Sequence, residues 1–257
     1  MVSRRVLSIA AVVVVIGAGL VWLAVVYLRP QAPTAGAINL QEWKLTLPVA
    51  GKKGDADTVD PAAITEPWLT QGADGGLTFW APAAGATTKN SEHPRTELDN
   101  LTNFSAGTSG PRTLKVSLAV SQVPADTKDI IVGQIHGADD ISSVPFVMLH
   151  YKDGEVRVVV KQKRSGSEAQ SFPLLTGVPL NARFDFTITD SGDGTLVFSA
   201  THAGTTKQAT AKVPEAFHGA TVRFQVGDYQ QADSSQGDSD GGRLTMYQIN
   251  TSNSSAG

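Results

Sequence analysis

Residues 183–189 read Arg-Phe-Asp-Phe-Thr-Ile-Thr, a strict alternation of polar and apolar side chains. Successive side chains of a β-strand point to opposite faces, so this period of two predicts a strand with one buried face. Residues 190–194 form a Gly-rich turn, and residues 195–202 continue as a second strand-like run. The three segments together predict an antiparallel hairpin.

Similar short runs recur along the chain at intervals of about ten residues, joined by Gly-rich turns. Clear amphipathic helices are lacking, and only single helical turns are expected, in residues 61–69 and 213–218. We therefore expect an all-β fold, a jelly-roll β-sandwich of two antiparallel sheets. The remaining expected strands are residues 43–48, 77–82, 95–100, 114–120, 129–136, 146–151, 155–163, 221–231 and 243–250.

The N-terminal segment differs from the rest of the chain in its charge and hydrophobicity. Residues 6–28 carry no charge, and a helix of that length, at about 1.5 Å per residue, crosses a bilayer core. Arg4 and Arg5 precede it, which predicts an internal N-terminus and export of the folded part. We expect residues 1–29 to be a helical membrane anchor or a cleaved signal, and residues 30–37 a linker. A domain over 38–250 and a disordered tail over 251–257 complete the expected organisation, and the domain is expected outside the cytoplasm.

Composition and charge exclude several classes of protein. The 257 residues include no cysteine, so a disulfide framework, a thiol nucleophile and a Cys-ligated zinc site are excluded. Three basic residues and no acid lie in residues 1–37, so the remainder carries 18 basic and 24 acidic side chains. This balance argues against nucleic-acid binding, and a polyanionic substrate would need a locally basic cleft. We expect a monomer that contacts a membrane only through its N-terminal segment.

Three expected strands carry polar side chains on one face. Each feature alone is more often structural than catalytic: a lone strand histidine, a surface salt-bridge ladder or a surface tyrosine. Together they offer a guanidinium, an amide, an imidazole and a phenol. The residues that share a face are Arg95, Glu97 and Asp99 in the first strand, Gln134 and His136 in the second, and Arg223, Gln225, Tyr229 and Gln231 in the third.

These stretches resemble the three signature blocks of the alginate lyases of polysaccharide lyase family 7. The blocks are Arg-Thr-Glu-Leu at 95–98, Gln-Ile-His at 134–136 and Phe-Gln-Val-Gly-Asp-Tyr-Gln-Gln at 224–231. Residues 43–48, 81–91 and 241–247 support the match, which covers about residues 38–250. The resemblance implies a jelly roll whose concave groove is lined by the three blocks.

The resemblance also implies a reaction, the β-elimination of a polyuronate at a 4-linked sugar. Arg95 and Gln134 would neutralise the carboxylate beside C5, so that its proton can leave. His136 would take that proton, or Tyr229 would when the proton lies on the side of the leaving group, and Tyr229 would protonate the leaving oxygen. No metal or other cofactor is implied. The substrate-binding residues implied are Glu97, Arg223, Gln225, Gln231 and Lys89.

Two positions depart from the family pattern. Asp99 stands where the family usually has Arg, and Gln225 stands where it usually has Lys. The loss of two cations leaves another uronan, such as a glucuronan, open as the substrate, and Arg223 is the candidate to replace the lysine. In this family, Ile135 in the middle of the second block implies a preference for guluronate-containing stretches.

The sequence leaves two other functions and a metal site open. A β-sandwich of this kind could be a non-catalytic carbohydrate-binding module or a structural envelope protein. The loop at residues 233–240, rich in Asp and Ser, could be a calcium site, although a solvated loop is the commoner case.

Overall fold

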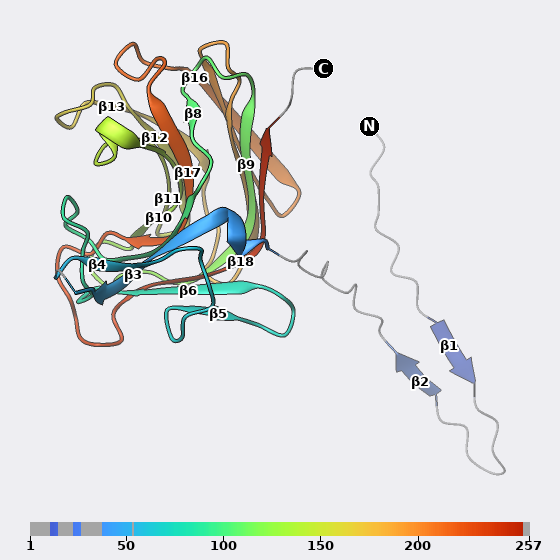
Figure 1. The fold of residues 1–257 in the computed structure, drawn as a ribbon. Coiled ribbons are helices and arrows are strands. Elements are labelled where there is room, and N and C mark those ends of the chain that lie inside the picture. Colours follow the sequence, from blue (N-terminus) through green and yellow to red (C-terminus); the bar gives the residue numbers. More distant parts are fainter. Residues whose placement is uncertain (1–10, 15–22, 27–37, 53, 254–257) are drawn as a thin grey trace, which may run out of the picture. The chain divides into compact units, whose positions relative to one another are not determined.

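A computed structural model describes residues 11–14, 23–26, 38–52 and 54–253, and the chain divides into two units, Met1–Thr34 and Ala35–Gly257 (Figure 1). In the first unit, β1 (Ala11–Val14) and β2 (Leu23–Val26) pair antiparallel. A helix was expected over residues 6–28. Apart from these two short strands, that segment lies outside the described residues, so the anchor or signal stays a prediction. Among the described residues, no helix is long and apolar enough to cross a membrane.

The second unit contains two sheets in which all pairings are antiparallel, and this confirms the all-β expectation (Figure 1). The larger sheet has the order β13-β12-β11-β10-β17-β7-β3-β4, with β8 also paired to β17. Its strands are β3 (Trp43–Ala50), β4 (Ala56–Val59), β7 (Arg95–Asn100), β8 (Phe104–Ser105), β10 (Asp129–Gly137), β11 (Pro145–Lys152), β12 (Glu155–Lys161), β13 (Ala169–Leu175) and β17 (Thr221–Gln230).

The smaller sheet has the order β16-β15-β14-β9-β18-β6-β5. Two 3-10 helices, η1 (Leu40–Glu42) and η2 (Asp139–Ile141), are the helical elements of the described residues. The strands of the smaller sheet are β5 (Leu69–Gln71), β6 (Leu77–Pro82), β9 (Arg112–Gln122), β14 (Arg183–Asp190), β15 (Thr195–His202), β16 (Thr205–Lys212) and β18 (Gly241–Asn253).

The core lies between the inner faces of the two sheets. The expected hairpin is β14 and β15, which pair with Ile188 opposite Phe198, both fully buried. Each such side chain stabilises the fold by about 1.5–3 kcal/mol relative to exposure. Phe186 packs so closely under Gly133 of β10 that a Cβ there would lie 2.5 Å from the ring. The absence of a side chain at Gly133 therefore lets the sheets approach directly behind the neighbouring Gln134.

Most expected strands are present, and the differences concern edges. β4 lies within a segment read as a loop, and neither β13 nor β16 was expected. All three end a sheet or lie at its margin, and their residues are largely exposed, so they lack the alternation that marks a half-buried strand. β18 continues to Asn253, so the tail expected from Thr251 was wrong for those three residues, and 254–257 lie outside the described part.

Strand register places the three polar faces on one side of the larger sheet. β7, β17 and β10 are neighbours in its middle, and directly opposite residues of antiparallel strands share a face. Tyr229 lies opposite both Arg95 and Ile131, whereas His136 lies opposite Arg223. A second row across four strands consists of Lys44, Asp99, Gln225 and Gln134.

Candidate active site

A pocket of about 240 Å³ opens on this face of the larger sheet. Four basic residues and one acidic residue line it, so the site is locally basic within an acidic domain. Such a pocket attracts an anionic ligand despite the overall charge. Its lining residues are Lys44, Thr46, Thr58, Thr88, Lys89, Asn90, Arg95, Asp99, His136, Ser142, Ser143, Arg223 and Gln225.

Arg95 connects several of the candidate residues. Its Nη1 donates to Glu97 Oε2 at 2.9 Å and its Nη2 donates to Ser91 Oγ at 3.0 Å. The guanidinium lies over the Tyr229 ring, 3.6 Å from the ring centroid. Its buried Nε has no hydrogen-bond partner. Because a guanidinium carries more N–H groups than these contacts use, Arg95 retains donors for an anionic ligand.

Gln134 and Glu97 form a buried pair behind Arg95. Gln134 Nε2 donates to Glu97 Oε1 at 2.6 Å and to Gln225 Oε1 at 3.1 Å. Burial raises the pKa of Glu97, an effect that Arg95 opposes and Asp99 reinforces. The hydrogen bonds to Glu97 and Gln225 engage both amide hydrogens of Gln134. A hydrogen bond from Gln134 to a substrate requires an exchange, and neutral Gln225 is the weaker acceptor to give up.

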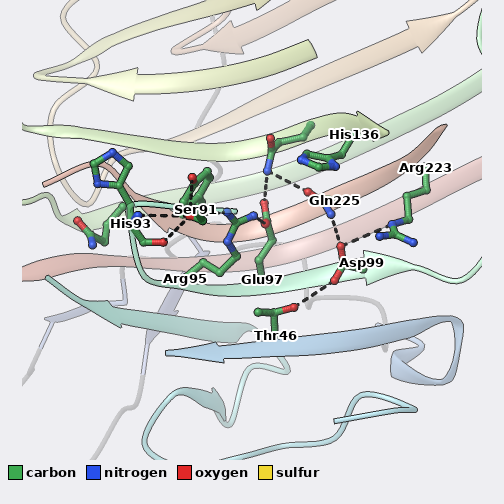
Figure 2. Close-up of polar contacts among 12 residues, drawn as sticks. Thr46, Ser91, His93, Arg95, Glu97, Asp99, His136, Arg223 and Gln225 are labelled. Atoms are coloured by element: carbon green, nitrogen blue, oxygen red, sulfur yellow. Dashed lines mark hydrogen bonds and ion pairs between the residues drawn. The ribbon is translucent and has the colours of Figure 1, made fainter. Parts of the chain in front are cut away.

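Asp99 is surrounded by donors. It accepts hydrogen bonds from Thr46 Oγ1 at 3.2 Å and from the Gln225 amide, and it forms an ion pair with Arg223, whose Nε lies 3.7 Å from Oδ1 (Figure 2). These contacts offset its charge, which explains how a carboxylate is accommodated in a pocket suited to anions. They also restrain Arg223, the basic side chain beside His136.

His136 is held as a neutral imidazole. Its Nδ1 lies 3.1 Å from the carbonyl oxygen of Gly137, which can only accept, so Nδ1 carries the proton and Nε2 has the free lone pair. Burial lowers the pKa of His136 to about 4, and the nearby Arg95 and Arg223 act in the same direction. At neutral pH the ring is thus able to accept a proton. Figure 2 shows His136, Gln225 and Arg223 on the side of the site away from His93.

Tyr229 packs against Arg95 and also contacts Ser91 and His93. Its hydroxyl is 2.9 Å from Ser91 Oγ, and its ring packs at a tilt against His93 with a centroid distance of 6.2 Å. No hydrogen bond among the described residues joins Tyr229 to His136. Arg95 lies in contact with the Tyr229 ring and lines the same pocket as His136, so both side chains border the region around Arg95.

The structure brings most of the predicted site residues together, with one exception. Gln231 follows the end of β17, does not line the pocket and donates to the carbonyl oxygens of Tyr229 and Gln230. Tyr229, Glu97 and Gln134 do not line the pocket either, but they contact Arg95 or Gln225, which do. Sequence reasoning missed Ser91 and Lys44. The only signals were indirect: Lys44 lies on the polar face of the first domain strand, and Ser91 ends the segment leading to the first block.

The loop at residues 233–240 is held by two carboxylates, Asp240 within it and Asp126 outside it, that accept backbone N–H bonds. Asp240 accepts backbone N–H bonds from Ala125 and Gln236, and Asp126 accepts those of Asp233 and Ser234. Among the residues that the structure describes, no group of three or more His, Cys, Asp or Glu side chains is arranged to hold a metal ion.

Comparisons with known proteins agree with the site. The family model described as alginate lyase matches residues 38–253. An alginate lyase from Pseudomonas aeruginosa has a similar structure, with a TM-score of 0.73 and 27% identity over 84% of this chain and 99% of its own. Alginate lyase A1-II′, a member of polysaccharide lyase family 7, has a TM-score of 0.71 and 27% identity over 84% and 96%. A variant of A1-II′ that is 28% identical, with a TM-score of 0.69 and coverage of 84% and 96%, was solved with a product. No curated protein matches the chain in sequence.

Proposed function

The chain belongs to the alginate lyase family, and from this membership we propose how its own residues carry out the reaction. The protein is a polysaccharide lyase that cleaves an alginate-like polyuronate by β-elimination at a 4-linked uronate. The observation that supports the residue roles best is the pairing of Arg95, with unused N–H donors, and a neutral His136 in one basic pocket.

The first requirement of the reaction is to make the C5 proton acidic. The neighbouring carboxylate resists further negative charge, so a cation must bind it as the proton leaves. Arg95 binds this carboxylate through its remaining N–H groups, and Gln134 adds a donor after it releases Gln225. Each donor of this kind is typically worth a few kcal/mol in the transition state. Glu97 orients both groups, because it accepts a hydrogen bond from each.

His136 Nε2 then takes the C5 proton, and the electron pair of the C5–H bond becomes the C4–C5 double bond. The bond from C4 to the leaving oxygen breaks in the same elimination. Tyr229 gives its proton to that oxygen, and the electron pair left on the phenol lies beside the Arg95 guanidinium. Where the C5 proton lies on the side of the leaving group, a deprotonated Tyr229 takes it instead of His136 and passes the same proton to the leaving oxygen.

The remaining basic side chains bind neighbouring uronates. Lys89 and Arg223, and with them Lys44, line the pocket and supply charge beyond Arg95. Gln225 adds an amide, and the predicted contribution of Gln231 requires a movement of its side chain toward the pocket. Because Asp99 holds Arg223, a glucuronan or another uronan is the second candidate substrate.

A panel of uronans, read by the ultraviolet absorbance of the unsaturated product, tests this proposal. Polymannuronate, polyguluronate and glucuronan should be compared with wild-type protein and the Tyr229→Phe and His136→Ala variants. Tyr229→Phe should lose about a hundredfold or more in kcat on every uronan that is cleaved, and His136→Ala should lose as much on those whose C5 proton lies opposite the leaving group. Tyr247→Phe is a matched control, because Arg183 stacks on that ring in the same way, 3.7 Å from its centroid and outside the site. Binding without product on every uronan would instead select the non-catalytic carbohydrate-binding function.

We also infer that the domain works outside the cytoplasm, supported by the uncharged residues 6–28 that follow Arg4 and Arg5. We propose further that it works as a monomer. N-terminal sequencing of the protein recovered from cells separates an anchored chain from a cleaved one. Sedimentation equilibrium tests the monomer. A soluble protein that retains residues 1–29 in the cytoplasm would contradict the localisation.

A further inference from the structure

The hydroxyl of Ser91 is the hydrogen-bond partner of the Tyr229 phenol among the described residues. We propose that Ser91 is a positioning residue that donates to the phenol oxygen, so that the proton of Tyr229 stays free for the leaving oxygen. This inference rests on the acid role proposed for Tyr229. It adds a residue that neither the sequence blocks nor the pocket lining includes.

Four polar contacts converge on Ser91 Oγ. It lies 2.9 Å from the Tyr229 hydroxyl and 2.9 Å from the carbonyl oxygen of His93. Arg95 Nη2 donates to it at 3.0 Å, and the backbone N–H of His93 donates to it at 3.3 Å. Figure 2 shows Ser91 between His93 and Arg95.

Either hydroxyl can be the donor in the bond between Ser91 and Tyr229, so the direction is part of the proposal. A hydroxyl has one proton and two lone pairs. A guanidinium and a backbone N–H can only donate, so Arg95 and His93 occupy both lone pairs of Ser91. Because these two donors already point at Ser91 Oγ, a third donor there is disfavoured, and we assign Tyr229 as the acceptor. The Ser91 proton is shared between the His93 carbonyl and the Tyr229 oxygen, and the phenol accepts.

The backbone holds Ser91 in this position. Its own N–H donates to the Thr88 carbonyl at 3.0 Å, which closes a turn, and Pro94 restricts the chain just beyond it. The imidazole Nδ1 of His93 bonds the carbonyl of Ala232 at 3.0 Å, which ties this segment to the residues that follow β17. Ser91 is thus held by a backbone hydrogen bond within its own turn, and His93 links that turn to the chain that follows Tyr229.

This direction favours proton donation by Tyr229. When the phenol O–H bond breaks, its proton forms the new O–H bond of the leaving sugar and the electron pair stays on the phenol oxygen. A hydrogen bond to a charged oxygen is stronger than one to a neutral oxygen. Ser91 therefore stabilises the phenolate more than the phenol and lowers the barrier through Tyr229, without touching the substrate.

Steady-state kinetics on the best uronan test the proposal with Ser91→Ala, Ser91→Thr and the remote control Ser199→Ala. Ser91→Ala should lower kcat about ten- to a hundredfold with KM within about twofold, the range expected for a hydrogen bond to a charged group. The alkaline limb of the kcat profile should move to higher pH. Ser91→Thr retains the hydroxyl and should restore most of kcat.

A double-mutant cycle gives a second readout. In the Tyr229→Phe background, Ser91→Ala should cost no further activity, because Ser91 acts only through the Tyr229 hydroxyl, which this variant lacks. Ser91→Cys, a poor donor of similar shape, should lie between alanine and wild type and serves if the alanine variant does not fold.

Several outcomes would overturn the inference. One is an unchanged kcat in Ser91→Ala. Another is a rise in KM alone, which would mean that Ser91 acts through Arg95. A third is an alkaline limb of the kcat profile that stays at the same pH in Ser91→Ala. A wild-type protein that forms no product on any uronan would remove the proposed function itself, and is therefore distinguishable from these results.

Discussion

Replacing His136 with Asn should change how the stability of the domain depends on pH. Burial lowers the pKa of His136 from 6.5 to about 4. As the pH falls through this window, the unfolded chain binds a proton at His136 before the folded chain does, so acidification favours unfolding. The stability is present above about pH 6.5 and is lost as the pH approaches 4. A shift of this size corresponds to about 3 kcal/mol in the free energy of unfolding.

Urea denaturation, followed by tryptophan fluorescence at neutral pH and near pH 4, measures this effect. Other titrating groups contribute in the same way to wild type and variant, so the difference between them isolates His136. The wild-type protein should lose about 3 kcal/mol more than His136→Asn between the two pH values. His218→Asn, at an exposed histidine, is the control and should behave as wild type.

The same imidazole should shape the kinetics, because a base that stays neutral well below pH 6.5 keeps kcat/KM level into the acid range. Equal pH dependence of stability in wild type and His136→Asn would refute the buried neutral imidazole. The assignment of His136 as the base would then lose its physical support.

Three further changes follow from the contacts around the pocket. Glu97→Gln should lower kcat/KM about ten- to a hundredfold in steady-state assays, because Arg95 loses the charged acceptor that orients it; a loss below twofold would contradict this role. Asp99→Asn should release Arg223 and lower KM for a polyuronate a few-fold at low salt, with the effect fading at high salt; an unchanged KM at low salt would count against it. Gly227→Ala should lower the melting temperature, at a cost of about 2 kcal/mol or more, because φ is 151° and a Cβ would collide with the carbonyl oxygen of Thr96; an unchanged melting curve would show that β17 adapts.

Much of the fold was predictable because alternation is a local property. Phe184, Phe186 and Ile188 are buried as the period of two requires, and the turn at residues 152–154 joins β11 to β12 as expected. Among the strands that were missed, β13 and β16 border solvent and gain their conformation from pairing with a neighbour. A residue pattern reports burial, and these segments are hardly buried.

The candidate site was predictable only in part, for a related reason. Strand parity placed Arg95 with Glu97, and Gln134 with His136, on common faces. It did not indicate that both amide hydrogens of Gln134 are engaged, or that Gln231 turns its amide onto nearby backbone carbonyls. Those facts depend on which acceptors lie within about 3 Å, and parity carries no information about them.

The sequence alone determined which side chains share a face of each strand, because that follows from the strand's own geometry. Only the tertiary structure decided which faces meet. The strand order β10-β17-β7-β3 brings Gln225 and Thr46 onto Asp99, and it gives Arg223 a counter-ion. It also places Ser91 against Tyr229, 138 positions away along the chain, a contact that no local pattern encodes because it depends on how the whole sheet is assembled.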